Sequence, residues 1–186
     1  YLRINTMKFI WHGINKSFDK KAKKFNVFEN ERWLKKQTQN LSRVLKSHEQ
    51  EGCSNYSEYC LSIIAASIKK KKISILDYGG GIGEEYFKLK KSVKNKKIKF
   101  FLLEKKEIIE LLKREGLNNE IFLLTKIKQN EKIDIIHFGS SFHYIENWKS
   151  ILKKCIKCKP EYFIFADILC GEIDRTFSTN QLYYEK

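Results

Sequence analysis

The sequence predicts an α/β protein whose core is a parallel β-sheet with helices on both faces. From residue 73 onward, short apolar runs alternate with amphipathic stretches of helical period. Most of these runs are apolar at successive positions, which is typical of strands that are buried on both faces of a parallel sheet. The single proline, Pro160, precedes the last run, where it interrupts no sheet hydrogen bond.

Five strands and three helices are predicted in this region. The first strand runs into a series of glycines, and Gly116 closes the second helix. Strands that alternate with helices pair in parallel, because each helix carries the chain back to the same edge of the sheet. We expect strands over residues 73–78, 98–104, 120–125, 133–138 and 161–166, and helices over 84–94, 105–115 and 148–156.

Residues 1–72 are predicted to form a helical cap, because they contain helical signals and no strong strand signal. Two apolar stripes with helical spacing support this prediction. The cap either only packs on the main domain or also lines a substrate cleft with its aromatic residues. The predicted organisation is a cap over residues 1–72 and a main domain over 73–186. The stripes are Phe28, Trp33, Leu34, Leu41, Val44 and Leu45, and then Tyr56, Tyr59, Cys60, Ile63, Ile64 and Ile68.

The 186-residue chain carries a formal charge of +15, and 32 of its 37 basic residues are lysine. Most of the excess lies before residue 73, with lysine-rich runs at 20–24 and 69–72. Proteins dedicated to nucleic acids tend to use arginine for bidentate phosphate and base contacts. We therefore expect solvated surface, with an anionic partner as the alternative, and we expect no nucleic-acid partner.

The five cysteines do not form a zinc-binding pattern. Cys155 and Cys158 make the C-x-x-C pair, and no second pair stands at zinc-site spacing. No apolar stretch approaches the roughly 20 residues that span a bilayer, and no signal-peptide pattern opens the sequence. We expect a cytoplasmic protein with reduced thiols, no bound metal and no membrane span.

The strongest functional signal is the glycine loop Asp77-Tyr78-Gly79-Gly80-Gly81-Ile82-Gly83, which joins the first strand directly to a helix. A tight turn and the close approach of a ligand both favour residues without a Cβ atom. The spacing is D-x-G-x-G-x-G, whereas a nicotinamide-binding fingerprint reads G-x-G-x-x-G. Glu84 and Glu85 then place negative charge where a phosphate would bind, so the loop favours a cationic ligand.

Two further groups follow neighbouring strands at the same predicted edge. Glu104 ends the second strand, where a carboxylate can accept hydrogen bonds from both ribose hydroxyls. Alternatively, it is a helix N-terminal acid that the helix dipole favours. Gly139, Ser140 and Ser141 follow the fourth strand and suit a cofactor wall and the mouth of an acceptor pocket.

From residue 73 to 167, these motifs resemble class I S-adenosylmethionine (SAM)-dependent methyltransferases. The shared features are D-x-G-x-G-x-G, an acid after the second strand, and S-x-x-H-Y-I after the fourth. More narrowly, LDYGGGIGEEYF, FGSSFHYIENW and PEYFIFADI are similar to a bacterial group of methyltransferases from surface-polysaccharide (capsule or O-antigen) biosynthesis clusters. NERWLKKQTQN and SNYSEYCLSIIAAS are similar to the helical N-terminal region of that group. The resemblance implies a Rossmann-like fold, SAM as cofactor, S-adenosylhomocysteine (SAH) as product, and a sugar or sugar-linked acceptor.

The resemblance also implies roles for individual residues. The loop glycines would approach the methionine part and the sulfonium, Asp77 would orient the amino end, and Glu104 would bind the ribose. Thr125 and Lys126 stand where such enzymes often have an adenine-contacting acid. Ser140 and Ser141 would lie beside the methionine part. The expected cofactor-binding residues are Asp77, Gly79, Gly80, Gly81, Gly83, Glu104, Thr125, Gly139, Ser140 and Ser141.

His143 and Asp167 are the candidate catalytic residues. A hydroxyl acceptor needs a general base near its proton, and an unperturbed histidine titrates close to neutral pH. Asp167 stands at the tip of the fifth strand and faces the expected cleft, as a base or as an acceptor ligand. His137 lies inside the fourth strand, so we expect it to be a hydrogen-bonded core residue.

Methyltransferases of this class complete their sheet with a sixth and a seventh strand. Only 18 residues follow Ile168, too few for a helix and that hairpin. We therefore expect these strands to be missing and the native chain to continue past Lys186. Two other functions stay open: an RNA methyltransferase that docks through its lysine-rich helices, and a cofactor-binding module that regulates a partner without catalysis.

Overall fold

The computed structural model describes residues 11–18, 28, 30–47, 59–128, 131–168, 170–172, 174–175 and 177–181. The chain divides into two compact units, one formed by Tyr1–Trp33 with Cys170–Lys186 and the other by Leu34–Leu169. The lysine run at 20–24 and the stripe residue Tyr56 lie outside the described residues. The functional boundary expected after residue 72 stays a prediction.

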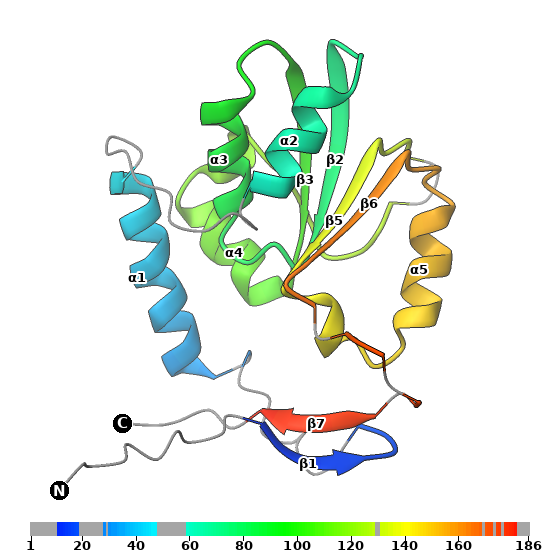
Figure 1. Cartoon of the computed structure of the whole chain (residues 1–186). Helices are drawn as coiled ribbons and strands as arrows, with labels where there is room; N and C mark the ends of the chain where they lie inside the picture. Colours follow the sequence, from blue (N-terminus) through cyan, green and yellow to red (C-terminus); the bar gives the residue numbers. More distant parts are fainter. Residues whose placement is uncertain are drawn as a thin grey trace, which may run out of the picture. The chain divides into compact units, whose positions relative to one another are not determined.

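The larger unit is built on the predicted parallel sheet (Figure 1), which has five strands in the order β4-β3-β2-β5-β6. All four strand pairings are parallel. The chain winds outward from β2 in one direction through β3 and β4, and in the other through β5 and β6. The carboxyl ends of β2 and β5 therefore flank a switch point, where α/β sheets bind ligands. The strands are β2 Lys72–Tyr78, β3 Lys97–Leu103, β4 Phe122–Leu124, β5 Ile135–Gly139 and β6 Tyr162–Ala166.

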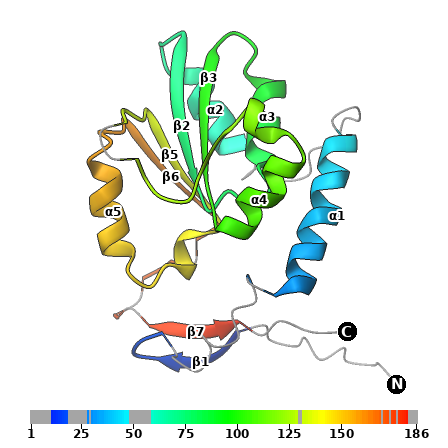
Figure 2. The same cartoon turned by 180° about the vertical axis from the view of Figure 1, so that it is seen from behind.

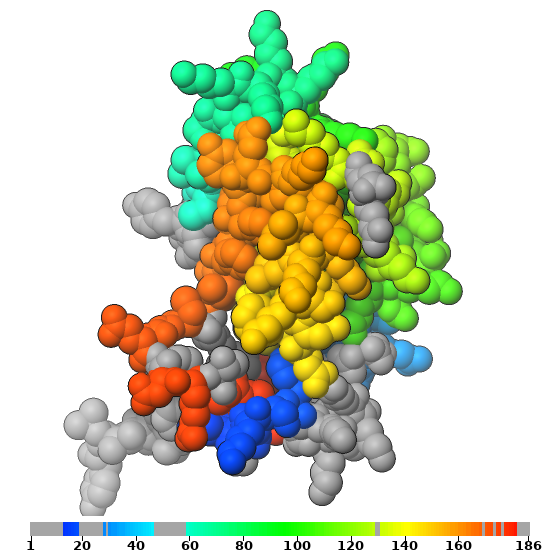
Figure 3. Space-filling view, turned by 90° about the vertical axis from the view of Figure 1, so that its right-hand side faces the viewer, coloured from blue at the N-terminus to red at the C-terminus, as the bar shows by residue number. Residues whose placement is uncertain are grey.

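Helices cover both faces of this sheet, as Figures 1 and 2 show. One face carries α2 (Cys60–Ser67), α3 (Glu84–Ser92) and α4 (Lys106–Arg114), and the other carries α5 (Trp148–Ile156). Figure 3 looks onto the face that α5 and β6 form. Beneath α5, the buried core includes Leu76, Phe101, Ile136, Phe138 and Cys155. Burial of these apolar side chains away from water stabilises the unit.

The described cysteines carry free thiols. Cys155 and Cys158 are both buried, and Cys155 belongs to the core beneath α5. Burial raises the pKa of Cys155 to about 12, with the neighbouring Cys158 adding to the shift. A thiol that stays protonated at neutral pH is a weak nucleophile, so this pair packs as apolar side chains. Cys53 lies outside the described residues.

The stripe predicted between residues 56 and 68 is wrong in its details. The helix begins only at Cys60, and it buries Leu61, Ser62 and Ala65. Ile63, which was expected inside, is 63% exposed. Every side of this segment carries apolar or small residues, so its period did not show which side faces the sheet.

The first predicted stripe lies on α1 (Glu31–Ser47). Leu41 is buried, and Trp33, Leu34, Val44 and Leu45 are partly buried. Phe28 precedes the helix and contacts Trp33 edge to face, with ring centroids 5.5 Å apart. No helix among the described residues is long and apolar enough to cross a membrane.

The smaller unit contains a two-stranded ribbon that the sequence analysis missed. Residues 11–15, expected to be part of a helical cap, form strand β1 (Trp11–Asn15), which pairs antiparallel with β7 (Ser178–Gln181). The pairing joins segments more than 160 residues apart, which a local pattern does not reveal. Within the described ranges, β7 pairs with β1 rather than with the central sheet. The central sheet therefore has five strands among the described residues, without the two further strands that complete it in class I methyltransferases.

Candidate functional site

The glycine loop forms a tight turn from β2 into α3. Gly79, Gly81 and Gly83 have φ values of 69°, 56° and 82°, in the left-handed region that other residues seldom adopt. The amide of Gly79 donates to the carbonyl of Leu103 (2.8 Å), which ties the turn to the neighbouring strand. A Cβ on Gly81 would meet no atom within 4 Å, so this position faces open space.

Asp77 and His137 form a buried pair beside this turn. The two residues lie opposite each other in the register of β2 and β5. Nδ1 of His137 is 2.8 Å from Oδ1 of Asp77, and the side chains are 4% and 1% exposed. This contact confirms the expectation that His137 is a hydrogen-bonded interior residue. Oδ2 of Asp77 is also buried, and it accepts no hydrogen bond from the described part of the chain.

The Asp77–His137 pair accounts for two glycines around it. A Cβ on Gly80 would lie 2.4 Å from Oδ2 of Asp77, and one on Gly139 would lie 2.7 Å from Cε1 of His137. Similarly, a Cβ on Gly79 would meet Cβ of Ser141 at 2.6 Å. These distances are shorter than van der Waals contact, so the protein's own packing requires glycine at all three positions.

The pKa of His137 reflects competing effects. Burial by itself lowers this pKa, but the hydrogen bond to Asp77 and the negative charges of Asp77 and Glu85 outweigh burial, so the pKa is raised. A histidine with a raised folded-state pKa stabilises the fold most at low pH. Its contribution is complete below about pH 6.5 and is lost as the pH rises through the raised pKa.

The ends of β5 and β6 supply a second polar pair. Oγ of Ser140 donates to Oδ2 of Asp167 (3.3 Å), and both residues have φ of 52°. Two neighbouring non-glycine residues in the left-handed region are a strained arrangement of the kind that gathers at functional sites. Ser141 differs, because its hydroxyl donates to the carbonyl of Tyr78 (2.6 Å) and thereby joins β5 to β2.

A cavity of about 310 Å³ opens at this edge of the sheet, within the range of small-molecule sites. Its wall carries four carboxylates against one lysine, Lys88, in a chain whose net charge is +15. Gln37 reaches the wall from α1, a contribution that no sequence motif indicated. The lining residues are Gln37, Asp77, Gly79, Gly80, Gly81, Ile82, Glu84, Glu85, Lys88, His137, Gly139, Ser140, Ala166 and Asp167.

Glu85 and Lys88 form an ion pair in the wall, with 2.8 Å between Oε1 and Nζ. Burial nevertheless raises the pKa of Glu85, because desolvation outweighs the attraction of Lys88 and His137. The pairing neutralises the only lysine of the wall. Asp77 is paired with His137, whereas Glu84 and Asp167 form no ion pair among the described residues. Such a wall attracts a cationic group and repels a phosphate.

Of the predicted site residues, Asp77, Gly79, Gly80, Gly81, Gly139, Ser140 and Asp167 line this cavity. Gly83, Glu104, Thr125, Ser141 and His143 do not line it. His143 lies on the short turn η5 (Phe142–Tyr144), and Thr125 is exposed after β4. Burial lowers the pKa of His143, so its ring is neutral at physiological pH.

Glu104 directly follows β3, and its amide donates to the carbonyl of Leu124 (3.0 Å). Burial raises the pKa of its carboxyl group; the hydrogen bond from the Lys105 amide opposes this shift. The side chain is partly buried. Glu104 therefore stands at the same edge of the sheet as the glycine turn but outside the cavity wall.

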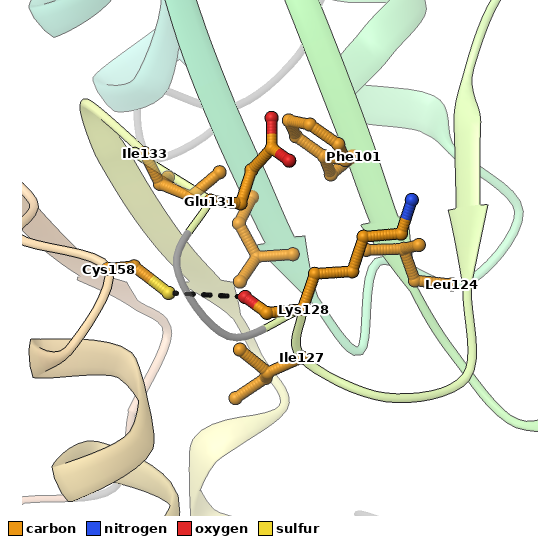
Figure 4. Close-up of a pocket in the computed structure, with 8 residues that line it drawn as sticks. Phe101, Leu124, Ile127, Lys128, Glu131, Ile133 and Cys158 are labelled. Carbon is orange, nitrogen blue, oxygen red and sulfur yellow. Dashed lines mark hydrogen bonds between the residues drawn. The ribbon is translucent and has the colours of Figure 1, made fainter.

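A second hollow lies under the loop after β4 (Figure 4) and has a volume of only about 10 Å³. Leu124, Ile127 and Ile133 line it, and the Cys158 thiol donates a long, weak hydrogen bond to the carbonyl of Lys128 (3.9 Å). This space is about that of one water molecule, so it binds no cofactor. Among the described residues, no three potential metal ligands come together.

No family model matches the chain, and no curated protein matches its sequence. Solved structures give matches at low identity. A protein of Methanococcus maripaludis, described as a candidate S-adenosyl-L-methionine-dependent methyltransferase, has 16% identity and a TM-score of 0.49 over 67% of this chain and 57% of its own. The plantazolicin methyltransferase BpumL, solved with SAH, has 18% identity and a TM-score of 0.47 over 73% of this chain and 51% of its own.

A SAM-dependent methyltransferase from Aquifex aeolicus has 18% identity and a TM-score of 0.41, over 63% of this chain and 66% of its own. The chain thus spans little more than half the length of the first two of these structures. At such identities, a likeness concerns the fold alone. The ligand and the reaction must therefore be inferred from the cavity.

Proposed function

We propose that this protein is a SAM-dependent methyltransferase and that the cavity behind the glycine turn binds the cofactor. One observation carries the proposal: an acid-rich cavity at the carboxyl edge of a parallel sheet, in a strongly basic chain. Dinucleotide and nucleotide cofactors place phosphates at this edge, and the carboxylates of the wall disfavour them. SAM has no phosphate, and its sulfonium and ammonium groups outweigh its one carboxylate, so its net positive charge suits the wall.

The residues present fit this cofactor. Gly81 leaves open space beside the turn, which permits close approach of a ligand. The buried Oδ2 of Asp77 lacks a donor from the described residues, and an ammonium group supplies one. Glu104 stands at the tip of the neighbouring strand and would accept from the ribose hydroxyls. When bound, SAM supplies a methyl group that its sulfonium makes electrophilic.

We further propose a sugar or sugar-linked acceptor in surface-polysaccharide biosynthesis, methylated in the cytoplasm. The support for this acceptor is the resemblance of the sequence motifs. For a hydroxyl acceptor, Asp167 is the favoured base, because it is exposed and lines the cavity. Ser140 donates to its carboxylate and restricts its orientation. His143 is the second candidate, since a neutral imidazole can take up a proton.

The lysines at the beginning of three strands of the sheet lie away from the cavity. These lysines are exposed: Lys72 begins β2, Lys97 begins β3 and Lys159 precedes β6. In a parallel sheet, the first residues of all strands lie at one edge. The cavity lies at the opposite edge, so a polyanion held by these lysines would not be presented to it.

A transfer assay with SAM labelled in its methyl group tests the function. We expect label in nucleotide sugars or lipid-linked glycan intermediates and none in total RNA. Asp167→Asn should lower the transfer rate by about 10² or more if the carboxylate is the base, a larger effect than the fall in SAH affinity that the loss of one wall charge causes. Label in RNA would favour the RNA methyltransferase, and cofactor binding without any transfer would favour the regulatory module.

Glu104→Gln tests the proposed ribose contact. The variant should bind SAH about tenfold more weakly at pH 7, because a hydrogen bond to a charged acceptor is lost. In the wild type, affinity should fall as the pH is lowered towards the raised pKa of Glu104, and Glu104→Gln should remove that part of the pH dependence. Calorimetric titration between pH 5 and pH 8 measures both effects.

Glu107→Gln is the matched control, because Glu107 is exposed on the first turn of α4. A raised pKa means that ionised Glu104 is disfavoured in the fold, so Glu104→Gln should not destabilise the free protein at pH 7. Equal SAH affinities of the two variants would exclude the ribose contact.

A further inference from the structure

The carboxylate of Asp77 has two oxygens in different situations. Oδ1 receives a hydrogen bond from Nδ1 of His137 at 2.8 Å, and Oδ2 is buried without a donor among the described residues. The space next to Oδ2 is where a Cβ of Gly80 would lie. Asp77 and His137 both line the cavity, so the pair stands next to the proposed cofactor site.

Oδ2 is a hydrogen-bond acceptor, so its partner in the ligand must be a hydrogen-bond donor. An ionised carboxylate only accepts hydrogen bonds, and a buried acceptor without a donor is destabilising. A sulfonium has no N–H or O–H group and cannot donate. A primary ammonium has three N–H donors and a positive charge, so the ammonium of an amino acid moiety is the partner that fits.

The orientation of that oxygen depends on His137. A carboxylate can rotate about its Cβ–Cγ bond, and a fixed donor on one oxygen determines where the other lies. His137 provides such a donor, because its register opposite Asp77 and its burial hold the ring in place. The missing Cβ of Gly139 leaves room for the ring. Glu85 and Lys88 of α3 line the same cavity and form an ion pair with each other.

We propose that His137 is a positioning residue for ligand recognition: it holds Asp77 through Oδ1 so that Oδ2 accepts a hydrogen bond from the ammonium group of the cofactor's amino acid moiety. The inference rests on the proposed function and adds a residue that acts through Asp77. From the sequence, His137 was expected only to be a hydrogen-bonded residue inside a strand.

Three substitutions separate this role from simple packing. Asn places a donor nitrogen close to where Nδ1 of histidine lies, and Leu has the same branched shape without a donor. Gln is polar but carries its donor one bond further out. The three variants His137→Asn, His137→Leu and His137→Gln therefore differ mainly in whether a donor faces Oδ1 of Asp77.

The test compares SAH with its deamino analogue, which lacks only the ammonium group, by calorimetric titration of the full chain. The wild type should prefer SAH by about tenfold or more, the value of a charge-assisted hydrogen bond. His137→Asn should keep that preference. His137→Leu and His137→Gln should lose the preference, because their affinity for SAH falls about tenfold. Their affinity for the deamino analogue should change by less than about twofold.

A structural role alone would weaken both ligands equally, and that result would overturn the inference. So would an unchanged preference in His137→Leu and His137→Gln. If His137→Leu does not fold, as its circular dichroism and melting temperature would reveal, the comparison of Gln with Asn decides the matter. Failure of the wild type to bind SAH at all would instead reject the proposed function.

Discussion

Gly81→Arg is expected to abolish SAH binding, with affinity reduced by at least about 100-fold. Gly81 lines the cavity, and its Cβ position is open, so an arginine side chain would enter the space that the cofactor needs. Its positive charge would also neutralise the acidic wall that attracts a cationic ligand. Because the side chain meets no protein atom near its Cβ, the substitution blocks the site without breaking the packing.

The matched control is Gly116→Arg. Gly116 follows α4 with φ of 79°, and its Cβ position is also free of atoms within 4 Å. The two variants therefore share the backbone strain of an arginine in the left-handed region, about 1–2 kcal/mol. Calorimetry should show wild-type SAH affinity for Gly116→Arg. Measurable binding within tenfold of the wild type by Gly81→Arg would contradict the assigned site.

Gly139→Ala is expected to lower the free energy of unfolding by about 1–3 kcal/mol, as overpacking of a dense interior does. The added methyl group would lie 2.7 Å from Cε1 of His137, and that ring is held by its bond to Asp77. Either the ring must leave Asp77 or β5 must shift. Urea unfolding followed by circular dichroism measures the loss.

A double-mutant cycle isolates the cause. In a His137→Ala background the ring is absent, so the added methyl of Gly139→Ala should cost less than about 0.5 kcal/mol. An equal loss in both backgrounds would show that strain elsewhere in β5, rather than contact with His137, disfavours alanine.

The central sheet was predictable from local pattern. Each strand of the larger unit is a short apolar run, and the predicted first strand, 73–78, differs by one residue from β2, Lys72–Tyr78. The helix predicted over 148–156 matches α5. Alternation of such segments is enough to predict parallel pairing, since each crossover restores the chain direction.

Features that depend on distant partners were not predictable in the same way. The strand β1 pairs with residues near the other end of the described chain, and Gln37 reaches the cavity from α1. His137 was correctly expected to be hydrogen-bonded inside. Its place in the cavity wall follows from the register of β2 and β5, which no single segment encodes.

The glycine loop shows how one motif can have two physical origins. The tight turn and the close approach of a ligand were the two predicted reasons for its glycines. In the structure, Gly79 and Gly80 are also required because side chains of the protein itself occupy the Cβ positions. Gly81 is the loop position that lines the cavity with free space beside it, so it carries the strongest argument for ligand approach.

Titration of the wild-type protein with SAH, in parallel with ATP, tests the central claim most directly. An acid-rich cavity behind a glycine turn should bind SAH with a dissociation constant below about 100 μM and should show no binding of ATP, whose phosphates the wall carboxylates repel. Absence of SAH binding, or ATP that binds and displaces SAH, would contradict the assignment of this cavity to SAM.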